Sequence, residues 1–338
     1  MIKCMGILKS KVICIGEALV DEIIDKSKDE YIHYLGGAPA NVACTLSNLS
    51  VDTAFIGCVG NDDYGQLFIK KFEKIKIDHN LLQISKKFPT RIVQVEKNQK
   101  GDRVFVGFQN NSSKNYADEM LDVAELTKKQ HTLETMYIST KYIVVGTLFL
   151  SSSKTSESIY YLLNYAQKFN IKIIIDVNWR DIFWDNSILM RDKTREEQNK
   201  IIKHFLGFAN LLKLSKEEAI QFFRTDDPIQ ISCSLQKKPD VIITDGPEPI
   251  AWYVSGFVGL TKIVNTLPIV DTTGAGDAFL GGLISKLIYL DEVTNENQIS
   301  QIIQYASACG LLNCLSQGAI DNLPNDKNIQ AYLETKGL

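Results

Sequence analysis

Asp271-Thr272-Thr273-Gly274-Ala275-Gly276-Asp277-Ala278-Phe279 is the stretch of this sequence that decides the fold. Phe279, Leu283 and Leu287 recur every four residues, which predicts a long helix that begins near Ala275. Two glycines flank one small residue, so the backbone can come close to a ligand with its N–H groups exposed. At a helix N-terminus such groups form an anion site, and phosphate is the natural occupant. The stretch therefore predicts a phosphate-binding turn.

Asp277 is unexpected beside a phosphate site, because a carboxylate repels phosphate unless it has a task. A general base for a hydroxyl that attacks a phosphoryl group has such a task. The alternative is structural, since the positive end of a helix dipole favours an aspartate in the first turn. The residues alone leave both interpretations open.

A second glycine-rich stretch, Gly36-Gly37-Ala38-Pro39-Ala40-Asn41, precedes a predicted helix. The two glycines allow close approach of a flat polyol, and the Asn41 amide offers a donor and an acceptor to hydroxyl groups. The alternative is a turn followed by a helix-capping amide.

Both stretches resemble signatures of the PfkB carbohydrate kinases. Residues 271–279 resemble the family's Asp-Thr-x-Gly-Ala-Gly-Asp signature, and Gly36–Asn41 resembles its Gly-Gly-x-x-x-Asn element, in the same order along the chain. The resemblance extends from about Lys11 to Pro324. It implies a ribokinase-like, three-layer α/β/α fold with a central, mostly parallel sheet. A small β-sheet lid is expected from about residues 18–35 and 88–110, within a single kinase domain, 1–338.

The resemblance also implies a reaction, in which ATP is the phosphoryl donor and Mg²⁺ neutralises its phosphates. Asp277 is then the catalytic base, and the turn Gly274-Ala275-Gly276 supplies backbone N–H groups to the transferred phosphoryl group. On the sugar side it implies contacts from Gly37, Asn41 and Asp21. Asp21 ends Gly16-Glu17-Ala18-Leu19-Val20-Asp21, which resembles the family's Gly-Glu-x-Leu-x-Asp segment.

Asp176-Val177-Asn178-Trp179-Arg180 follows a predicted apolar strand. Polar groups just past the carboxyl end of a parallel strand face the ligand crevice in open α/β sheets. The segment resembles the Asp-x-Asn-x-Arg element of fructokinases, which implies that Asn178 and Arg180 serve the sugar or a phosphate. The competing interpretation is an Arg180 that only pairs with Asp181 or Asp185.

Two metal sites follow from the resemblance. In the segment 213–218, Glu218 stands where relatives have the glutamate of Asn-x-x-Glu, which orders water around Mg²⁺. The alternative is that Glu218 favours the first turn of a helix capped by Ser215. Asp271 and Thr273 lie on the loop that wraps a monovalent cation in the family, so K⁺ is expected.

The nucleotide side departs from the family pattern. Thr244 and Gly246 resemble the start of its Thr-x-Gly-x-x-Gly turn, but the second glycine is missing. Ser307 replaces a more usual asparagine near the adenine, and Gly276 is expected to contact the phosphates. The adenine contacts are therefore the least defined part of the predicted site.

Strands and helices alternate along much of the chain, which predicts a parallel sheet covered on both faces. Residues 20–34, 91–95 and 103–108 instead have the alternation of exposed strands, and 98–102 is expected to connect the last two as a hairpin. The predicted strands of the main sheet are 11–15, 53–59, 142–145, 172–177, 211–214, 241–244 and 251–254, and the predicted helices begin near 38, 65, 154, 194, 216 and 275.

The segments around residues 36–43, 116–118, 176–180 and 213–218 favour fructokinase within the family, with fructose converted to fructose 6-phosphate. The alternatives are 2-keto-3-deoxygluconate kinase and ribokinase. A sugar acid stays possible as the substrate, because Arg91 or Arg103 on the lid could bind its carboxylate. A different class is a fructokinase-like binding subunit without catalysis, which is expected to have lost the base or the anion hole. Both are intact here. A further alternative is an NAD-dependent enzyme, but the sequence lacks the glycine fingerprint of that class.

Composition limits the partners. With 37 basic and 40 acidic side chains, the net charge of −3 provides no large cationic field for nucleic acid or a membrane surface. No apolar run reaches the roughly 18 residues that span a bilayer, and no export signal is recognisable, so a cytoplasmic location is expected. The alternating lid strands predict one exposed face and a homodimer formed through the lid.

Overall fold

The computed structural model describes residues 11–25, 30–97, 103–109, 115–185, 187, 189–190, 192–263 and 267–337. The predicted connection 98–102 lies outside these ranges. Eight strands form a central sheet in the order β14-β13-β12-β11-β10-β9-β1-β4, and all neighbours from β12 to β4 are parallel. The strands are β1 (Lys11–Ile15), β4 (Asp52–Ile56), β9 (Thr140–Gly146), β10 (Lys172–Asp176), β11 (Leu211–Ser215), β12 (Asp240–Thr244), β13 (Ile250–Val254) and β14 (Phe257–Thr261).

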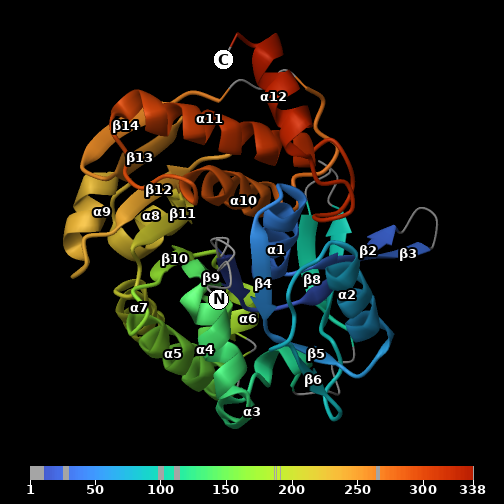
Figure 1. The fold of residues 1–338 in the computed structure, drawn as a ribbon. Coiled ribbons are helices and arrows are strands. Elements are labelled where there is room, and N and C mark those ends of the chain that lie inside the picture. The colour runs from blue at the N-terminus through green and yellow to red at the C-terminus, as the bar shows by residue number, and fades with distance from the viewer. Residues whose placement is uncertain are drawn as a thin grey trace, which may run out of the picture.

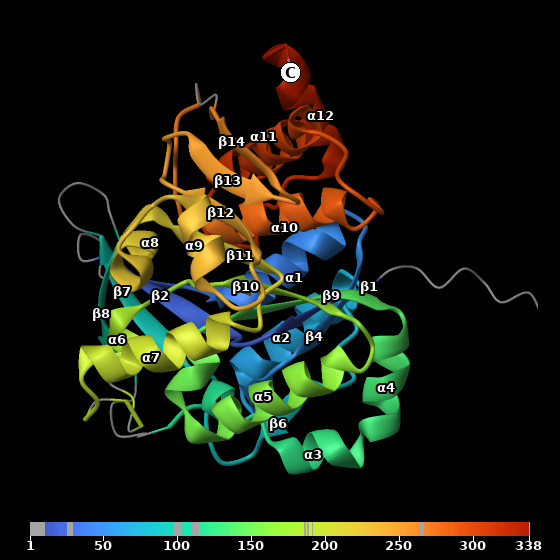
Figure 2. The same ribbon diagram turned by 90° about the vertical axis from the view of Figure 1, so that its left-hand side faces the viewer.

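Both faces of this sheet are apolar and covered by helices, which confirms the predicted three layers (Figures 1 and 2). In β1, Val12 and Cys14 belong to one core, whereas Ile13 and Ile15 belong to the other, because successive side chains of a strand point to opposite faces. The first face packs against α1 (Ala38–Asn48), α2 (Asp63–Lys74), α10 (Ala275–Leu287) and α11 (Glu296–Asn313), with α12 (Asp326–Thr335) outside α11. The second packs against α3 (Val123–Lys128), α4 (Gln130–Ile138), α5 (Ser153–Gln167), α6 (Asp181–Asp185), α7 (Arg195–Leu206), α8 (Lys216–Phe223) and α9 (Pro228–Ser234).

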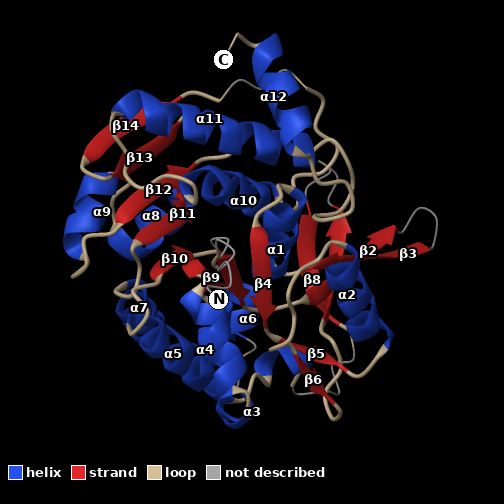
Figure 3. Cartoon of the chain, in the orientation of Figure 1, coloured by secondary structure: helices blue, strands red, loops and turns tan. Residues whose placement is uncertain are grey.

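A separate four-stranded sheet, here called the lid, lies beside the central sheet (Figure 3). Its order is β3-β2-β7-β8, with β2 (Leu19–Asp25), β3 (Glu30–Gly36), β7 (Ile92–Lys97) and β8 (Arg103–Phe108). The strands fall close to the two predicted ranges, and the small sheet of the predicted fold is confirmed.

One predicted strand is wrong in extent. Residues 53–59 form two strands, because the chain turns at Gly57 and β5 (Cys58–Gly60) pairs with β6 (Gln83–Ser85) in a two-stranded sheet. A side chain at Gly57 would lie 2.5 Å from the carbonyl oxygen of Gly16, so only glycine fits this bend. In addition, β6, β14, α3, α4, α6, α9 and α12 were not predicted, and β13 runs antiparallel to both of its neighbours, β12 and β14. Within the described ranges, no helix has the length and apolarity needed to cross a membrane.

Candidate active site

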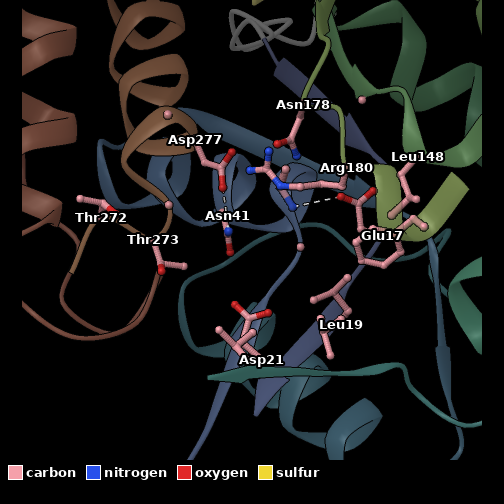
Figure 4. A pocket seen from close by; sticks show the side chains of 18 of the residues that line it. Glu17, Leu19, Asp21, Asn41, Leu148, Asn178, Arg180, Thr272, Thr273 and Asp277 are labelled. Atoms are coloured by element: carbon pink, nitrogen blue, oxygen red, sulfur yellow. Dashed lines mark hydrogen bonds between the residues drawn. The ribbon is translucent and has the colours of Figure 1, made fainter. Parts of the chain in front are cut away.

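A pocket of about 730 Å³ lies between the lid, the carboxyl ends of β1 and β10, and the N-terminus of α10 (Figure 4). This is the edge of a parallel sheet where ligands bind in open α/β folds. Most of the predicted site residues are brought together here. The predicted residues in its lining are Asp21, Gly37, Asn41, Asn178, Arg180, Asp271, Thr273, Gly274, Gly276 and Asp277.

The N-terminus of α10 is built as an anion site. Gly274 precedes the helix with a φ of 73°, and a side chain there would lie 2.7 Å from the Ala319 Cβ, so the turn requires glycine. No acceptor from the described part of the chain meets the N–H groups of Gly276 and Asp277. The N–H of Ala275 instead donates to the Thr272 carbonyl at 3.2 Å. Its predicted contact with phosphate is therefore not formed here and stays a prediction.

Asp277 and Asn41 connect the two glycine-rich stretches. The Asn41 amide nitrogen donates to an Asp277 carboxylate oxygen at 2.8 Å, as the dashed line in Figure 4 marks. Burial raises the pKa of Asp277 to about 6, and the Asp176 carboxylate adds to this, whereas Asn41, Lys213 and Arg180 lower it. At pH 7 Asp277 is thus mostly ionised yet basic enough to accept a proton.

Lys213 and Asp176 form a buried ion pair next to Asp277 that the sequence analysis did not assign. They are directly opposed on β11 and β10, with the Lys213 ammonium 3.1 and 2.9 Å from the two Asp176 oxygens. A side chain at residue 276 would lie 3.0 Å from the Lys213 nitrogen. The positive charge therefore lies directly under the anion site. A lysine inside an otherwise apolar central strand was the available signal.

The Lys213 charge is maintained against its burial. Burial alone lowers the pKa of Lys213, but the nearby carboxylates of Asp176, Glu218 and Asp277 outweigh it and leave this pKa raised. Lys213 is therefore a permanent cation of the pocket wall.

Glu17 is a second pocket residue that was not assigned. It is 4% exposed, and its carboxyl oxygen Oε1 accepts the N–H of Ala38 at 3.1 Å. Gly37, with a φ of 102°, packs on the Glu17 backbone, where a side chain would lie 2.5 Å from the Glu17 carbonyl oxygen. The glutamate of the Gly-Glu-x-Leu-x-Asp resemblance was the signal that could have found it.

Asn178 and Arg180 enter the pocket from the end of β10. Asn178 has a φ of 39°, a left-handed conformation that asparagine tolerates better than most residues. Arg180 lines the pocket and donates to the Trp179 carbonyl at 3.0 Å. The two acids that could have competed for it, Asp181 and Asp185, lie 3.0 and 3.7 Å from Arg195 instead. Arg180 thus remains available to an anionic ligand.

Glu218 caps α8, and it does not line the pocket. Its two oxygens accept the N–H groups of Trp179 at 2.6 Å and Ser215 at 2.7 Å, the second within a reciprocal capping box. The described ranges contain no group of three or more His, Cys, Asp and Glu side chains that could hold a metal ion directly. This donor set fits a Mg²⁺ that is bound chiefly by phosphates and contacted by protein through water.

The loop before α10 provides oxygen atoms for a monovalent cation. One oxygen of Asp271 accepts the Thr273 N–H and hydroxyl, and the other accepts the Gly318 N–H at 3.0 Å. Asn313 donates to the Thr273 carbonyl at 3.1 Å, while its own Oδ1 and the Ser316 hydroxyl are buried without a partner in the described part of the chain. Buried oxygens that lack a donor fit a cation.

The three predicted adenine-side residues lie away from the pocket lining. Thr244 ends β12 and donates weakly to the Leu214 carbonyl at 3.5 Å. Gly246, with a φ of 54°, faces open space. The Ser307 hydroxyl donates within α11 to the Ile303 carbonyl. These three residues therefore do not line the pocket, and their contacts with adenine stay predictions.

The three-layer fold, its lid, and a helix N-terminus that carries a buried carboxylate define a ribokinase-like phosphotransferase. The family model for pfkB family carbohydrate kinases matches residues 9–326, so the chain belongs to this family and is an ATP-dependent carbohydrate kinase. The predicted family and the predicted class of enzyme, a carbohydrate kinase, are both confirmed.

Similar proteins agree with this assignment. The chain is 28% identical to probable fructokinase-6, chloroplastic, of Arabidopsis thaliana, over 95% of this chain and 82% of the relative. A fructokinase structure from Xylella fastidiosa with bound ATP shares the fold, with a TM-score of 0.83, 21% identity and coverage of 98% and 100%. A Vibrio cholerae fructokinase bound to fructose, ADP and calcium has a TM-score of 0.79 at 25% identity, with coverage of 97% and 100%.

Proposed function

We propose that this kinase transfers the terminal phosphoryl group of ATP to the primary hydroxyl of fructose, forming fructose 6-phosphate. The observation that carries the proposal is the 2.8 Å hydrogen bond between Asn41 and Asp277. It holds a polyol-binding amide and a carboxylate base together beside the unpartnered N–H groups of α10. A hydroxyl that binds Asn41 would lie next to both its base and the phosphoryl group.

Three features support a sugar at this position. The Oδ1 atom of Asn41 is buried without a hydrogen-bond donor in the described part of the chain, and a sugar hydroxyl would supply one. Asp21 lines the pocket from the lid, where a carboxylate can accept hydroxyl groups. Gly37 lines the pocket through its main chain, which a flat polyol can approach.

The proposed chemistry is an in-line transfer. Asp277 takes the proton of the primary hydroxyl, the hydroxyl oxygen bonds to the terminal phosphorus, and the bond from that phosphorus to the ADP oxygen breaks. The N–H groups of Gly276 and Asp277 stabilise the charge on the transferred group, and Lys213 adds a positive field below them. Bound Mg²⁺ would neutralise the phosphates. Glu218 is its proposed water-mediated contact.

The remaining ligands follow from their surroundings. Asp271 and Thr273 are proposed to hold K⁺ together with the unpartnered oxygens of Asn313 and Ser316. Thr244, Gly246 and Ser307 are proposed to border the adenine on the open side of the site. In this scheme the cation fixes the geometry of the loop that presents the anion site.

The surroundings of Arg91 remove one reason to expect a sugar acid as the acceptor. The buried guanidinium of Arg91 is bound to both Asp118 oxygens, at 3.1 and 2.9 Å, and to Glu119 at 3.0 Å. It is therefore committed to acids of this chain and is not available to the carboxylate of 2-keto-3-deoxygluconate. Arg103 is the other lid arginine that could bind such a carboxylate, and its side chain lies outside the described atoms. Ribokinase activity remains an alternative, because ribose also has a primary hydroxyl that could accept the phosphoryl group.

A homodimer through the lid is also proposed. Tyr31 and Ile32 on β3 are 57% and 37% exposed, which is unusual for apolar residues of an edge strand in water. Because consecutive side chains of a strand point to opposite faces, the two residues lie on either side of the β3 edge, and pairing of this edge with a second copy would reduce their exposure. A non-catalytic binding subunit is disfavoured, because Asp277 keeps a partner and a pKa suited to a base.

A panel of acceptors tests the proposal. ADP release would be measured with fructose, ribose, glucose and 2-keto-3-deoxygluconate at equal concentrations, and kcat/KM compared. We expect the kcat/KM of fructose to exceed that of every other acceptor by at least about tenfold, the low end of the discrimination that one changed pocket contact provides. A higher kcat/KM for ribose or for the sugar acid would replace fructose as the acceptor, and no turnover with any sugar would support the binding-subunit alternative.

A further inference from the structure

Glu17 is a carboxyl group in the pocket wall to which the reaction described above gives no role. It lies between β1 and β2, at the carboxyl end of a central strand, and lines the same pocket as Asn41 and Asp277. Figure 4 shows its side chain among those that face the pocket. A carboxyl group that is 4% exposed needs a compensating interaction, because burial of an ionised acid is costly.

The position of Glu17 is fixed by the start of α1. Its Oε1 atom accepts the Ala38 N–H at 3.1 Å, and Gly37 packs so closely on its backbone that no side chain fits between them. The main-chain N–H of Glu17 also acts on the carboxyl group, and among the described residues no side-chain donor reaches its second oxygen, Oε2. Oε1 is therefore held by the start of α1, whereas Oε2 can interact with a molecule that occupies the pocket.

The charges around Glu17 favour its neutral form. Within the described ranges no lysine, arginine or histidine forms an ion pair with it, and the groups that face it from other elements are the Ala38 N–H and the acids Asp118 and Asp277. Burial raises the pKa of Glu17 to about 8, and the two acids contribute in the same direction. The cations of the pocket wall, Arg180 and Lys213, act instead on Asp277.

We propose that Glu17 is a specificity-determining residue of the acceptor site, which donates a hydrogen bond from its carboxyl O–H to a hydroxyl oxygen of the sugar. The inference rests on the proposed function, since the ligand is the acceptor sugar. Glu17 and Asn41 are then complementary, because the Oδ1 atom of Asn41 accepts where Glu17 donates. A donor and an acceptor at fixed positions select the orientation of a polyol.

The test is the dissociation constant of fructose, measured by calorimetry from pH 6 to pH 9.5. For the parent protein we expect a constant Kd up to about pH 8 and then a rise of about tenfold per pH unit, as the donor loses its proton. In Glu17→Gln the amide keeps an acceptor for Ala38 and a donor for the sugar but does not titrate. Its Kd should be raised only a few-fold at pH 7, without the alkaline rise.

Two further variants complete the experiment. Glu17→Leu removes the donor and should raise Kd about 10- to 100-fold at every pH below 8, while Glu73→Gln, an exposed change on α2, should keep the parental profile. Thermal midpoints would check that each variant folds. Because Glu17→Gln keeps both hydrogen bonds, it remains informative if Glu17→Leu is unstable.

Several results would overturn the inference. These are a parental Kd without an alkaline rise, a Glu17→Gln profile that keeps the rise, or a folded Glu17→Leu variant with the parental Kd. Since binding is measured apart from turnover, fructose that binds without being phosphorylated would refute the proposed reaction and still allow Glu17 to be judged. If fructose does not bind, the same series is run with the acceptor that the panel identifies.

Discussion

Asp277→Asn separates the two interpretations of the acid at the start of α10. The replacement amide oxygen can still accept the Asn41 hydrogen bond, so the sugar and ATP should bind with nearly unchanged affinity. What is lost is the proton acceptor. With a pKa of about 6, Asp277 is about ten-to-one ionised at pH 7, so nearly every parental molecule carries the base.

The expected loss in kcat is about 10²- to 10⁴-fold, the usual contribution of a positioned general base, or about 2.7 to 5.4 kcal/mol of activation free energy. KM should stay within a few-fold, with the caution that KM equals Kd only when chemistry is slow. In the parent, kcat should also fall about tenfold per pH unit below pH 6, because protonation removes the base. Asp277→Asn should lack this acid limb.

The assay combines steady-state kinetics from pH 5 to pH 8 with thermal unfolding of the same preparation. The matched control is Asp63→Asn, which removes an exposed acid from the first turn of α2 and should cost stability only. A dipole-favouring role predicts about 0.3 to 1 kcal/mol of lost stability and a nearly normal rate. If Asp277→Asn phosphorylates the sugar within a few-fold of the parent, the assignment of Asp277 as base is wrong.

Three further predictions concern the surroundings of the base. Turnover should be higher in K⁺ than in choline, and Asn313→Ala should reduce that difference, whereas equal rates in K⁺, Na⁺ and choline buffers would contradict the cation site. Light scattering should detect a dimer that Tyr31→Asp shifts toward monomer, and a strict monomer at all concentrations would refute lid pairing. Lys213→Met combined with Asp176→Asn, which removes the ion pair without leaving one charge buried, should reduce kcat about tenfold or more through loss of the cation under the anion site, and a parental rate would exclude that role.

The fold could be predicted from the sequence because its signals are local. Apolar strands such as residues 11–15 and a helix that starts after Gly274 carry their periodicity in consecutive residues. Gly57 shows the limit of such signals. The strand on either side of it is continuously apolar, and the bend arises from contacts with Gly16 and Gln83, which are distant in sequence.

The residues of the candidate site also divide into those with a local sequence signal and those without one. Asn41 and Asp277 were found because each belongs to a short motif with a chemical meaning. Lys213 was not, although it lies in a segment that was examined for Glu218. Its role depends on the register between β10 and β11, which sets Asp176 opposite Lys213, and no pattern within either strand specifies that register. The single-domain prediction for residues 1–338 and the individual site roles stay predictions.

The two pocket carboxyl groups illustrate why such placement matters for function. Asp277 must be ionised to accept a proton, and Glu17 must be protonated to donate a hydrogen bond, yet burial raises the pKa of both groups. Asp118 and Asp277 also raise the pKa of Glu17, and Asp176 raises that of Asp277. The pKa values of the two acids differ because the cations and the Asn41 amide act on Asp277 and not on Glu17. Asn41, Lys213 and Arg180 limit the rise in the pKa of Asp277 to about 6, whereas only main-chain N–H groups oppose the effect of burial on Glu17, whose pKa is raised to about 8. Between these values both groups are in the state that the proposed roles require, so the environment of each acid, rather than the shared chemistry of the two carboxyl groups, suits one to catalysis and the other to recognition.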